Sequence, residues 1–265
     1  MKIGIVGCGG RMGRMLMDEV METEGCALAG GSERPDSDLI GRDPGELLGR
    51  RPLGVAITAD AGALFAASDA VIDFTTPAAT LAHADLAARS GKVLVIGTTG
   101  LSKDDEAAIS AAACRAPVVM APNFSVGVNL LLALTERAAA ILGDDYDIDI
   151  VEMHHRHKVD APSGTALGLG RAAASGRAVA LDQVWRKSRD GHTGARPRGE
   201  IGFATLRGGD VVGDHSVIFA AEGERVELTH KASSRVVFAK GAVRAARWAA
   251  TQPPGLYTMR DVLGL

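Results

Sequence analysis

The sequence has few aromatic residues, few cysteines and little excess charge of either sign. Aromatic residues make up 4% of its 265 residues, and the formal net charge is −3. A nucleic-acid-binding protein is expected to carry stacking aromatics or a basic face, so we expect no nucleic-acid partner. The three cysteines, Cys8, Cys26 and Cys114, are odd in number and scattered along the chain, which argues against a disulfide framework.

Targeting segments and uninterrupted hydrophobic runs are also missing. Residues 1–4 lead directly into a predicted strand and do not resemble a signal peptide. The most apolar stretch, residues 126–142, is interrupted by four polar or charged side chains: Asn129, Thr135, Glu136 and Arg137. We therefore expect no membrane partner and a cytoplasmic location.

Up to residue 125 the sequence contains a regular alternation of short apolar strands with helices. Strands are predicted at residues 2–6, 26–30, 55–58, 70–74, 92–96 and 117–120. Helices are predicted at residues 14–23, 60–67, 78–90 and from 103 onwards, where Ser102 is the expected N-cap. Residues 35–51 are predicted to be a surface loop. Such alternation is typical of an α/β fold with a Rossmann-like, mainly parallel sheet covered on both faces.

A glycine-rich loop follows the first predicted strand. Residues 7–13 read Gly-Cys-Gly-Gly-Arg-Met-Gly and precede a helix, which is the order that a dinucleotide site requires, although the last glycine falls one place late. Glu33 ends the second strand and is placed to bind ribose hydroxyls, and Arg34 beside it is placed to bind a 2′-phosphate. Tight packing and an ordinary charged turn would also explain these residues, but their combination favours a cofactor.

Small or polar loops also follow the later strands of this region. They lie at residues 74–77, 97–100 and 121–124. The carboxyl ends of parallel strands meet at one edge of a sheet, where ligands bind in such folds. Each loop alone is explained by turn chemistry, but together they are predicted to line one edge.

The most distinctive stretch of the chain is a histidine-rich loop. It follows a predicted strand at residues 146–151 and contains His154, His155, Arg156, His157 and Lys158. A helix predicted at residues 166–174 comes next, and its first turn, at positions 164 and 165, would present free N–H groups to an anion. A solvated basic loop would have the same composition. A metal site is disfavoured, because the histidines lack the helical i, i+4 spacing of zinc enzymes.

The pattern changes after residue 125, where a helix is predicted to residue 142. Beyond the histidine loop comes a polar loop at residues 185–198. Strands at residues 201–206, 215–220 and 225–231 are predicted to form an antiparallel meander. We therefore expect a second, α+β domain with a mixed open sheet. The helix at residues 235–251 is expected to return to the first domain, followed by a short tail at 253–265.

Several segments together resemble dihydrodipicolinate reductases, also named 4-hydroxy-tetrahydrodipicolinate reductases. They are residues 7–13, 71–75, 97–100, 123–129 and 154–166, and the similarity continues through 201–205 and 229–235. The histidine loop is the specific part of this resemblance. It implies an enzyme that uses NADH or NADPH to reduce 4-hydroxy-tetrahydrodipicolinate, or its dehydrated form, to tetrahydrodipicolinate in lysine and diaminopimelate biosynthesis.

The resemblance also implies a domain organisation and an assembly. Residues 1–125 and 235–265 would form the dinucleotide-binding domain, and residues 126–234 the domain for substrate binding and tetramerisation. The partners implied are a cyclic dicarboxylate substrate and three further copies of the chain in a homotetramer.

Carried over position by position, the resemblance assigns roles to individual residues. His154 and Lys158 match the catalytic proton donors, His155, Gly164 and Thr165 match substrate contacts, and no metal is implied. The positions that match cofactor contacts are Gly7, Cys8, Gly9, Gly10, Arg11, Met12, Glu33, Arg34, Gly97, Thr98, Thr99, Ala121, Pro122, Asn123 and Phe124. Cys8 is unusual there, and would be either a thiol open to oxidation or an inert small residue.

Three other functions are compatible with parts of the sequence. A nucleotide-binding redox sensor without turnover would explain the first domain but not the histidine loop. A metal-dependent hydrolase or lyase would use His154, His155 and His157. Another imine- or carbonyl-reducing dehydrogenase is the nearest alternative among enzymes.

Overall fold

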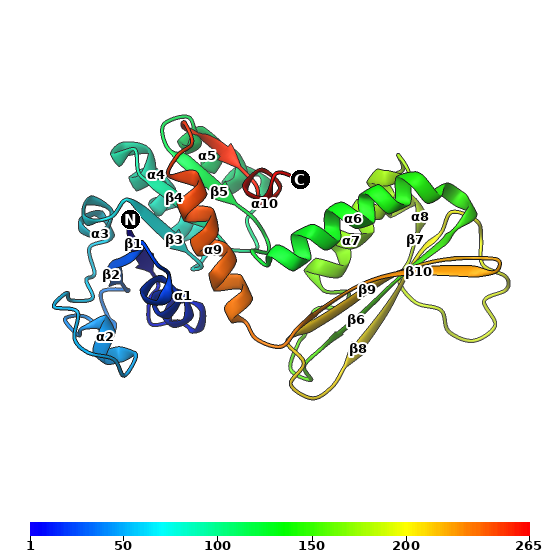
Figure 1. Ribbon diagram of the computed structural model, residues 1–265, viewed down its shortest axis with the longest axis horizontal. Coiled ribbons are helices and arrows are strands. Elements are labelled where there is room, and N and C mark those ends of the chain that lie inside the picture. The colour runs from blue at the N-terminus through cyan, green and yellow to red at the C-terminus, as the bar shows by residue number, and fades with distance from the viewer. The chain divides into compact units, whose positions relative to one another are not determined.

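The computed structural model describes residues 1–265, which divide into two compact units. Unit 1 contains residues 1–125 and 236–264, and unit 2 contains residues 126–235 with the last residue, Leu265. Each unit has its own sheet and its own helices (Figure 1).

The sheet of unit 1 has six strands, all parallel, in the order β11-β5-β4-β3-β1-β2. Their bounds are β1 Lys2–Val6, β2 Ala27–Ser32, β3 Ala70–Asp73, β4 Val93–Ile96, β5 Pro117–Met120 and β11 Gly255–Tyr257. The predicted Rossmann-like fold is confirmed. Strand β11 was not predicted, because a run of three residues is too short to show a period. The interpretation of residues 253–265 as a short tail is therefore wrong.

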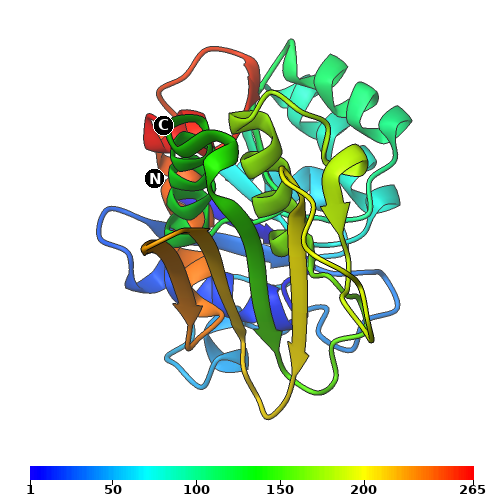
Figure 2. The ribbon, with the colours of Figure 1, turned by 90° about the vertical axis from the view of Figure 1, so that its right-hand side faces the viewer.

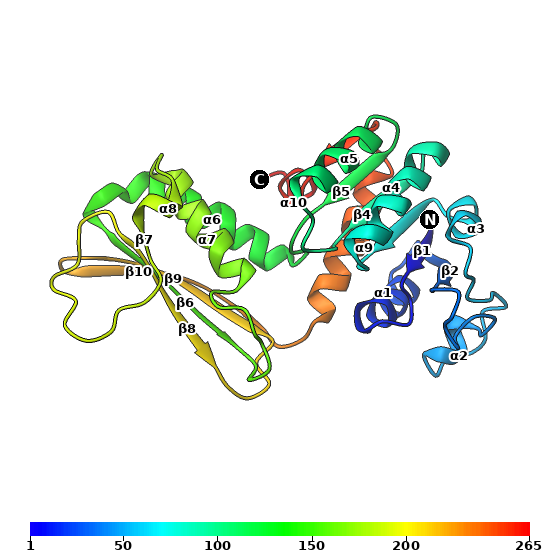
Figure 3. The ribbon, with the colours of Figure 1, turned by 180° about the vertical axis from the view of Figure 1, so that it is seen from behind.

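Helices cover both faces of this sheet. They are α1 Arg11–Glu22, α2 Pro44–Leu47, α3 Ala61–Ala67, α4 Pro77–Ser90, α5 Lys103–Ala113, α9 Val236–Ala249 and α10 Met259–Leu263. One buried cluster joins the sheet to α1, α9 and α10, and a second joins it to α3, α4 and α5. Figure 1 shows α9 in front of the strands, and Figure 3 shows α4 in front of them.

Local chemistry sets where these helices begin. Ser102 caps α5 as predicted, because its Oγ accepts from the N–H of Asp105 while the Asp105 carboxylate accepts from the N–H of Ser102. α9 is rich in buried alanine, and a Cβ at its Gly241 would overlap the carbonyl oxygen of Phe124. Small residues therefore let α9 lie close to the sheet.

The structure corrects several predicted boundaries in unit 1. α1 begins at Arg11 rather than residue 14, with Gly10 as its N-cap. The sequence obscures this start, since Gly13 looks like part of the glycine loop but lies inside the helix. Glycine is needed at this position because a Cβ would overlap the carbonyl oxygen of Gly7. The predicted loop at 35–51 contains α2, and the predicted strand at 55–58 is reduced to one bridge between Ser32 and Thr58.

The sheet of unit 2 is mixed, with strand order β10-β9-β6-β8-β7 (Figure 2). The strands are β6 Asp147–His154, β7 Trp185–Arg186, β8 Ile201–Arg207, β9 Gly213–Ala221 and β10 Glu224–Ala232. The mixed sheet was expected, but the meander is wrong, since β6 lies between β8 and β9 and pairs in parallel with β8. That pairing is between segments far apart in sequence, so local turn signals do not reveal it.

Helices α6 (Val126–Leu142) and α7 (Gly164–Gly176) pack against one face of this sheet. The 3-10 turn Gly143–Asp145 and the short helix α8 (Leu181–Val184) complete the unit. Contrary to the sequence expectation, the segment Val126–Asp145 is long and apolar enough to span a membrane by length and composition alone. In this unit its apolar face contacts α7 and β10.

Strand β6 is longer than the sequence predicted. It runs to His154, and its residues alternate between buried and partly exposed along the whole length. Two of the inward positions are polar, Glu152 and His154, which breaks the apolar alternation that marks a strand. His154 is therefore a strand residue, and the histidine loop begins after it.

Candidate active site

A pocket of about 380 Å³ lies in unit 1 at the carboxyl ends of β1, β2 and β3. It brings together four of the residues assigned to the cofactor: Gly7, Gly10, Glu33 and Arg34. Its other lining residues were not assigned from the sequence: Val6, Ser32, Ala59, Ala61, Phe74, Thr75, Thr76, Ala79 and His83. The pocket lies where parallel α/β sheets bind nucleotides.

The glycine loop is shaped by close approaches. Gly7 has φ +63°, a left-handed conformation that suits glycine. The N–H of Gly9 donates to Oε1 of Glu33 over 2.8 Å, and a Cβ at Gly9 would overlap the side chain of Leu39. α1 has no side-chain cap and no acidic residue in its first turn, so its N-terminus is suited to an anion such as a pyrophosphate.

Three residues of the loop do not line the pocket. Cys8 is fully buried, and its Sγ packs against Gly31. Burial, with the nearby charge of Glu33, raises the pKa of the Cys8 thiol to about 12. Of the two alternatives for Cys8, a thiol open to oxidation or an inert small residue, its burial therefore favours the inert residue. Arg11 is exposed and Met12 is partly buried against the core, so neither lines the pocket.

An aspartate–histidine pair in the pocket wall was missed from the sequence. Asp73 is fully buried at the end of β3, and its Oδ2 lies 2.8 Å from Nδ1 of His83, which lines the pocket from α4. Burial alone would raise the pKa of Asp73, but hydrogen bonds from His83 and Thr75 lower it overall. An acidic residue that ends an apolar strand was the only signal in the sequence.

The remaining predicted cofactor residues lie at the ends of β4 and β5, outside the lining of this pocket. Thr98 is buried, and its Oγ1 accepts from the hydroxyl of Thr80 and from the N–H of Thr75. A Cβ at Gly97 would overlap the ring of Phe74, whose centroid lies 5.6 Å from that of Phe124. The other four residues are Thr99, Ala121, Pro122 and Asn123, and they extend the same carboxyl edge.

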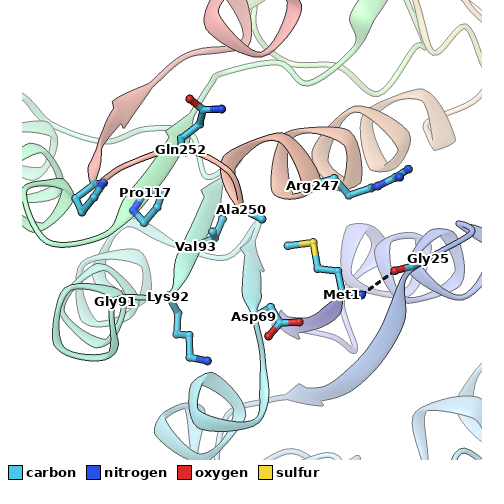
Figure 4. Close-up of a pocket in the computed structure, with 11 residues that line it drawn as sticks. Met1, Gly25, Asp69, Gly91, Lys92, Val93, Pro117, Arg247, Ala250 and Gln252 are labelled. Atoms are coloured by element: carbon cyan, nitrogen blue, oxygen red, sulfur yellow. Dashed lines mark hydrogen bonds between the residues drawn. The ribbon is translucent and has the colours of Figure 1, made fainter.

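A larger pocket of about 730 Å³ lies at the opposite, amino-terminal edge of the same sheet (Figure 4). Its polar groups are already engaged or do not converge. Asp69 accepts from the N–H of Lys2, and the N-terminal amine donates to the carbonyl of Gly25. Lys92 and Arg247 extend in different directions, so no convergent anion site is formed. The smaller pocket is the better candidate despite its size.

In unit 2 the polar residues gather around the end of β6. His154 is 8% exposed, and its Nδ1 lies 2.6 Å from Oε2 of Glu152. Arg207 of β8 binds the same carboxylate with both terminal nitrogens, over 2.8 and 3.0 Å. The other oxygen of Glu152, Oε1, accepts from the N–H of Ser163 over 3.0 Å. One carboxylate thus connects the histidine to the residue that precedes α7.

A second histidine, His215 of β9, lies beside this cluster. Its ring centroid is 5.0 Å from that of His154, and its Nε2 is 3.1 Å from Oγ of Ser163. Burial, followed by the charge of His154, lowers the pKa of His215 to about 4. This ring is therefore neutral at pH 7. Neither His215 nor Glu152 was assigned a role from the sequence.

The loop after His154 is held only in part by the protein. The N–H of His155 donates to the carbonyl of Val211, while Arg156 and His157 are exposed. Burial and the charge of Arg235 lower the pKa of His155. Lys158 pairs with Asp160, with Nζ 2.8 Å from Oδ1. The chain contains no group of three side chains suited to holding a metal ion.

Helix α7 begins at Gly164, so both residues expected in its first turn lie there. Ser163 is the N-cap, and its Oγ accepts from the N–H of Ala166. No atom lies within 4 Å of a Cβ built at Gly164, and the first turn holds no acidic residue. A carboxylate therefore has room to approach the N–H groups of Gly164 and Thr165.

Known proteins match the chain over its whole length. The family model described as dihydrodipicolinate reductase, N-terminus, matches residues 1–124, and that described as dihydrodipicolinate reductase, C-terminus, matches residues 127–263. The 4-hydroxy-tetrahydrodipicolinate reductase of Magnetococcus marinus is 57% identical over 263 residues, covering 99% of this chain and 98% of that protein. That of Rhodopseudomonas palustris is 57% identical over 265 residues, covering 100% and 98%.

A solved structure supports the fold independently. The dipicolinate-bound dihydrodipicolinate reductase from Paenisporosarcina sp. TG-14 superposes with a TM-score of 0.77 over 98% of both chains. Its sequence identity is 24%, so this likeness bears on the fold alone.

Proposed function

Because the chain belongs to the dihydrodipicolinate reductase family, we propose that its two units divide one reduction between them. Unit 1, with residues 1–125 and the C-terminal segment, binds the dinucleotide, and unit 2 binds the substrate and supplies a proton. The reaction is the NADH- or NADPH-dependent reduction of 4-hydroxy-tetrahydrodipicolinate, or of its dehydrated form dihydrodipicolinate, to tetrahydrodipicolinate in diaminopimelate and lysine biosynthesis.

The residues around the pocket of unit 1 fit a dinucleotide. Glycines let the loop pack closely against the rest of unit 1, and α1 begins there without a side-chain cap, which suits a pyrophosphate. The carboxylate of Glu33 is suited to ribose hydroxyls, and the guanidinium of Arg34 to a 2′-phosphate. When bound, the reduced nicotinamide supplies the hydride. The loops at residues 97–99 and 121–124 would hold it along the same carboxyl edge.

The start of α7 is proposed to hold a carboxylate of the substrate. The N–H groups of Gly164 and Thr165 and the positive end of the helix dipole favour an anion there. His155 and Lys158 would complete the site for a ring with two carboxylates. Lys158 now pairs with Asp160, so a substrate carboxylate would have to share or replace that partner.

We assign proton delivery to His154, assisted by Lys158. Hydride addition to the conjugated imine leaves a nitrogen and a carbon, one of which must take a proton. A histidine is suited to give that proton near neutral pH. Lys158 would stabilise negative charge as it develops on the ring and pass protons on. The observation that carries this proposal is the single carboxylate, Glu152, which binds both the His154 ring and the N-cap residue of α7.

The direct test is an assay with substrate made in place. Pyruvate and aspartate semialdehyde are condensed enzymatically, and the absorbance of NADH or NADPH is followed after this protein is added. We expect a loss of absorbance that depends on both precursors. If the absorbance is stable while the condensation proceeds, the reaction is not the one proposed. Protein purified without a metal-affinity tag is analysed for zinc in parallel, since an essential zinc would favour a hydrolase or lyase.

We also propose that four copies of the chain assemble through unit 2. The sheet face opposite α6 and α7 presents partly exposed apolar residues in a group: Val151, Met153, Ala204, Leu206 and Ile218. An apolar group of this kind on an uncovered sheet is typical of a protein–protein interface. Light scattering should give four times the subunit mass, and Leu206→Glu should lower it.

A cytoplasmic location completes the proposal. All three cysteines are unpaired, which suits a reducing compartment. Fractionation of cells that produce the protein would test it, and recovery outside the cytoplasm would contradict it.

A further inference from the structure

The most deeply buried charge in unit 2 has no assigned role in the reaction. Glu152 is 1% exposed, yet its side chain makes four hydrogen bonds. Oε1 accepts from Ser163 N–H and from one terminal nitrogen of Arg207. Oε2 accepts from the other nitrogen of Arg207 and lies 2.6 Å from Nδ1 of His154. The two oxygens therefore use all of their acceptor positions.

The partners of Glu152 keep it ionised. A peptide N–H and a guanidinium can only donate, so a proton on either oxygen would meet another donor. Burial alone raises the pKa of Glu152, but the hydrogen bonds from Arg207, His154 and Ser163 lower it overall. Arg207 also neutralises the carboxylate locally, which makes a buried charge at this position stable.

An ionised Glu152 determines which nitrogen of His154 carries a hydrogen. Because the carboxylate only accepts, Nδ1 must donate, and the proton that the ring exchanges is on Nε2. A Cβ at Gly213 would lie 3.0 Å from that nitrogen, so the glycine keeps Nε2 from being crowded on this side. The Glu152–His154 hydrogen bond, the orientation that it gives the ring and the absence of a side chain at Gly213 all indicate Nε2 as the reactive atom.

We propose that Glu152 is a positioning residue that keeps a hydrogen on Nδ1 of His154, so that the doubly protonated ring gives the proton on Nε2 to the substrate and is left as the Nδ1–H tautomer. This rests on the proposed role of His154 in proton delivery. The proton leaves Nε2, the ring becomes neutral with its remaining proton on Nδ1, and Glu152 keeps its charge throughout. Through Ser163 the same carboxylate fixes the start of α7 relative to Nε2. The distance between the proton donor and the anion site is thus set by one side chain.

The substitution Glu152→Gln separates the contact of residue 152 with His154 from its contact with Ser163. A glutamine keeps one oxygen, which can stay opposite Ser163 N–H and one terminal nitrogen of Arg207, and replaces Oε2 with an NH₂ group that faces His154. The hydrogen bond from the other terminal nitrogen of Arg207 to Oε2 is lost. That NH₂ group needs an acceptor, and Nδ1 can accept only in the Nε2–H tautomer. The substrate site should survive while the tautomer changes. We expect kcat to fall about 10²-fold, with KM changed by less than about threefold.

The tautomer of His154 can be measured directly, independently of enzyme activity. Protein labelled with ¹⁵N in the histidine rings is measured by NMR at alkaline pH, where the rings are neutral, and His154→Gln identifies the signal. Wild type should show the hydrogen on Nδ1, and Glu152→Gln should show it on Nε2. Glu152→Asp keeps the charge, so it should keep the Nδ1–H tautomer and have a higher kcat than Glu152→Gln.

Glu200→Gln is the matched control. Glu200 is also a buried carboxylate and is bound by Arg186 and Arg189, but it contacts no histidine. Its substitution should leave the tautomer of His154 unchanged and kcat within about twofold. A Glu152→Gln enzyme with the same small effect would overturn the proposal. If Glu152→Gln does not fold, the wild-type spectrum decides alone, since an Nε2–H tautomer there refutes it.

The outcome is distinguishable from a failure of the proposed function. If His154→Gln keeps its turnover, the role of His154 itself is wrong. If His154→Gln is inactive and Glu152→Gln is not, His154 acts but Glu152 does not position it.

Discussion

Unit 1 shapes its pocket with glycines and backbone N–H groups, whereas unit 2 gathers charged side chains at the end of one strand. In unit 1 the loop tolerates few added atoms, because Gly9 and Gly13 each lie against other parts of the chain. In unit 2 short hydrogen bonds connect the buried side chains of Glu152 and His154 with the partly exposed Arg207. The first site should be sensitive to volume, and the second to charge and to proton position.

The difference matches what each unit is proposed to bind. A pyrophosphate is recognised by backbone dipoles at a helix start, which need close approach rather than particular side chains. Proton transfer needs a titratable group held in one orientation, which only side chains provide. Five substitutions should sharpen or break this contrast.

The largest effect is expected from His154→Gln. Removing a general acid typically lowers the rate by about 10²–10⁴-fold, so kcat should fall in that range. KM should change little, because the proposed substrate contacts of Gly164 and Thr165 are left intact. NADH binding, followed by fluorescence, should be unchanged because the proposed cofactor site belongs to unit 1. Steady-state kinetics decide, and near wild-type turnover would return the loop to a solvated basic surface.

Combining this change with Lys158→Ala tests whether the two residues act in one step. The loss in the double variant should be much smaller than the product of the two single losses. Multiplied losses would mean that Lys158 has a separate role.

The next effect is on the stability of unit 2 in mild acid. In the unfolded chain His215 has a pKa of about 6.5, whereas burial lowers it to about 4 in the fold. Between these values the unfolded chain binds a proton that the folded chain does not, so stability falls as pH falls. The loss from pH 7 to pH 5 should be about 2 kcal/mol. The charges facing His215 are those of His154, Glu152, His230 and Lys158.

His215→Gln removes this titration and should flatten the loss. The measurement is urea unfolding at both pH values, followed by the fluorescence of Trp185, which packs edge-on against Phe203 in unit 2. Trp248→Phe, in unit 1, removes the other tryptophan and serves as the parent for both proteins. An equal loss of stability in parent and variant would show that another group is responsible. Glu152 has a lowered pKa, so its own contribution is lost at still lower pH.

Adding one methyl group at Gly9 should impair the proposed cofactor site of unit 1. The Cβ of Gly9→Ala would overlap Leu39 and lie 3.1 Å from Oε1 of Glu33, so the loop must shift. The Kd for NADH should rise roughly 20-fold, with little change in kcat at saturating cofactor. Gly168→Ala is the control, because its Cβ would be at an ordinary contact distance of 3.4 Å from Leu132 in unit 2. Unchanged binding in Gly9→Ala would mean that the loop does not limit affinity.

The smallest effect concerns the choice of cofactor. Arg34 is exposed, and its nearest carboxylate is that of Asp36, at 3.9 Å. Arg34→Ala should weaken NADPH by up to about tenfold, or 1.4 kcal/mol, and NADH much less. We expect wild type to use both cofactors with no more than about a tenfold preference. Equal losses for both in titrations would show that Arg34 does not reach the 2′ position.

The sequence predicted most of unit 1 because its signals are local. The strand at residues 117–120 and the N-cap at Ser102 were predicted from neighbouring residues, and both are confirmed. The pairing of β6 with β8 is not local, and the sequence gives no sign of it. Strand β11 is too short to show a period. Tertiary pairing, rather than propensity, determines these elements.

The two candidate sites show the same contrast between local signals, which the sequence reveals, and non-local ones, which it does not. The glycine loop and the histidine loop were located from the sequence, because each is a continuous segment. The residues that hold them were missed, because Glu152 pairs with Arg207 from 55 positions away. His83, ten positions after Asp73, is hidden in an ordinary helix pattern. A buried partner of this kind becomes visible only when the strands are placed side by side.

The discontinuity of unit 1 has a consequence for how the chain is made. Residues 1–125 leave the ribosome first, but α9 and β11, which complete their sheet, are synthesised last. Until then β5 is an open edge, and the apolar face that α9 covers is exposed to solvent. Unit 2 is continuous and can close as it emerges. The segment 1–125 should therefore be the part of the nascent chain most prone to aggregation, and truncation before β11 should cause aggregation.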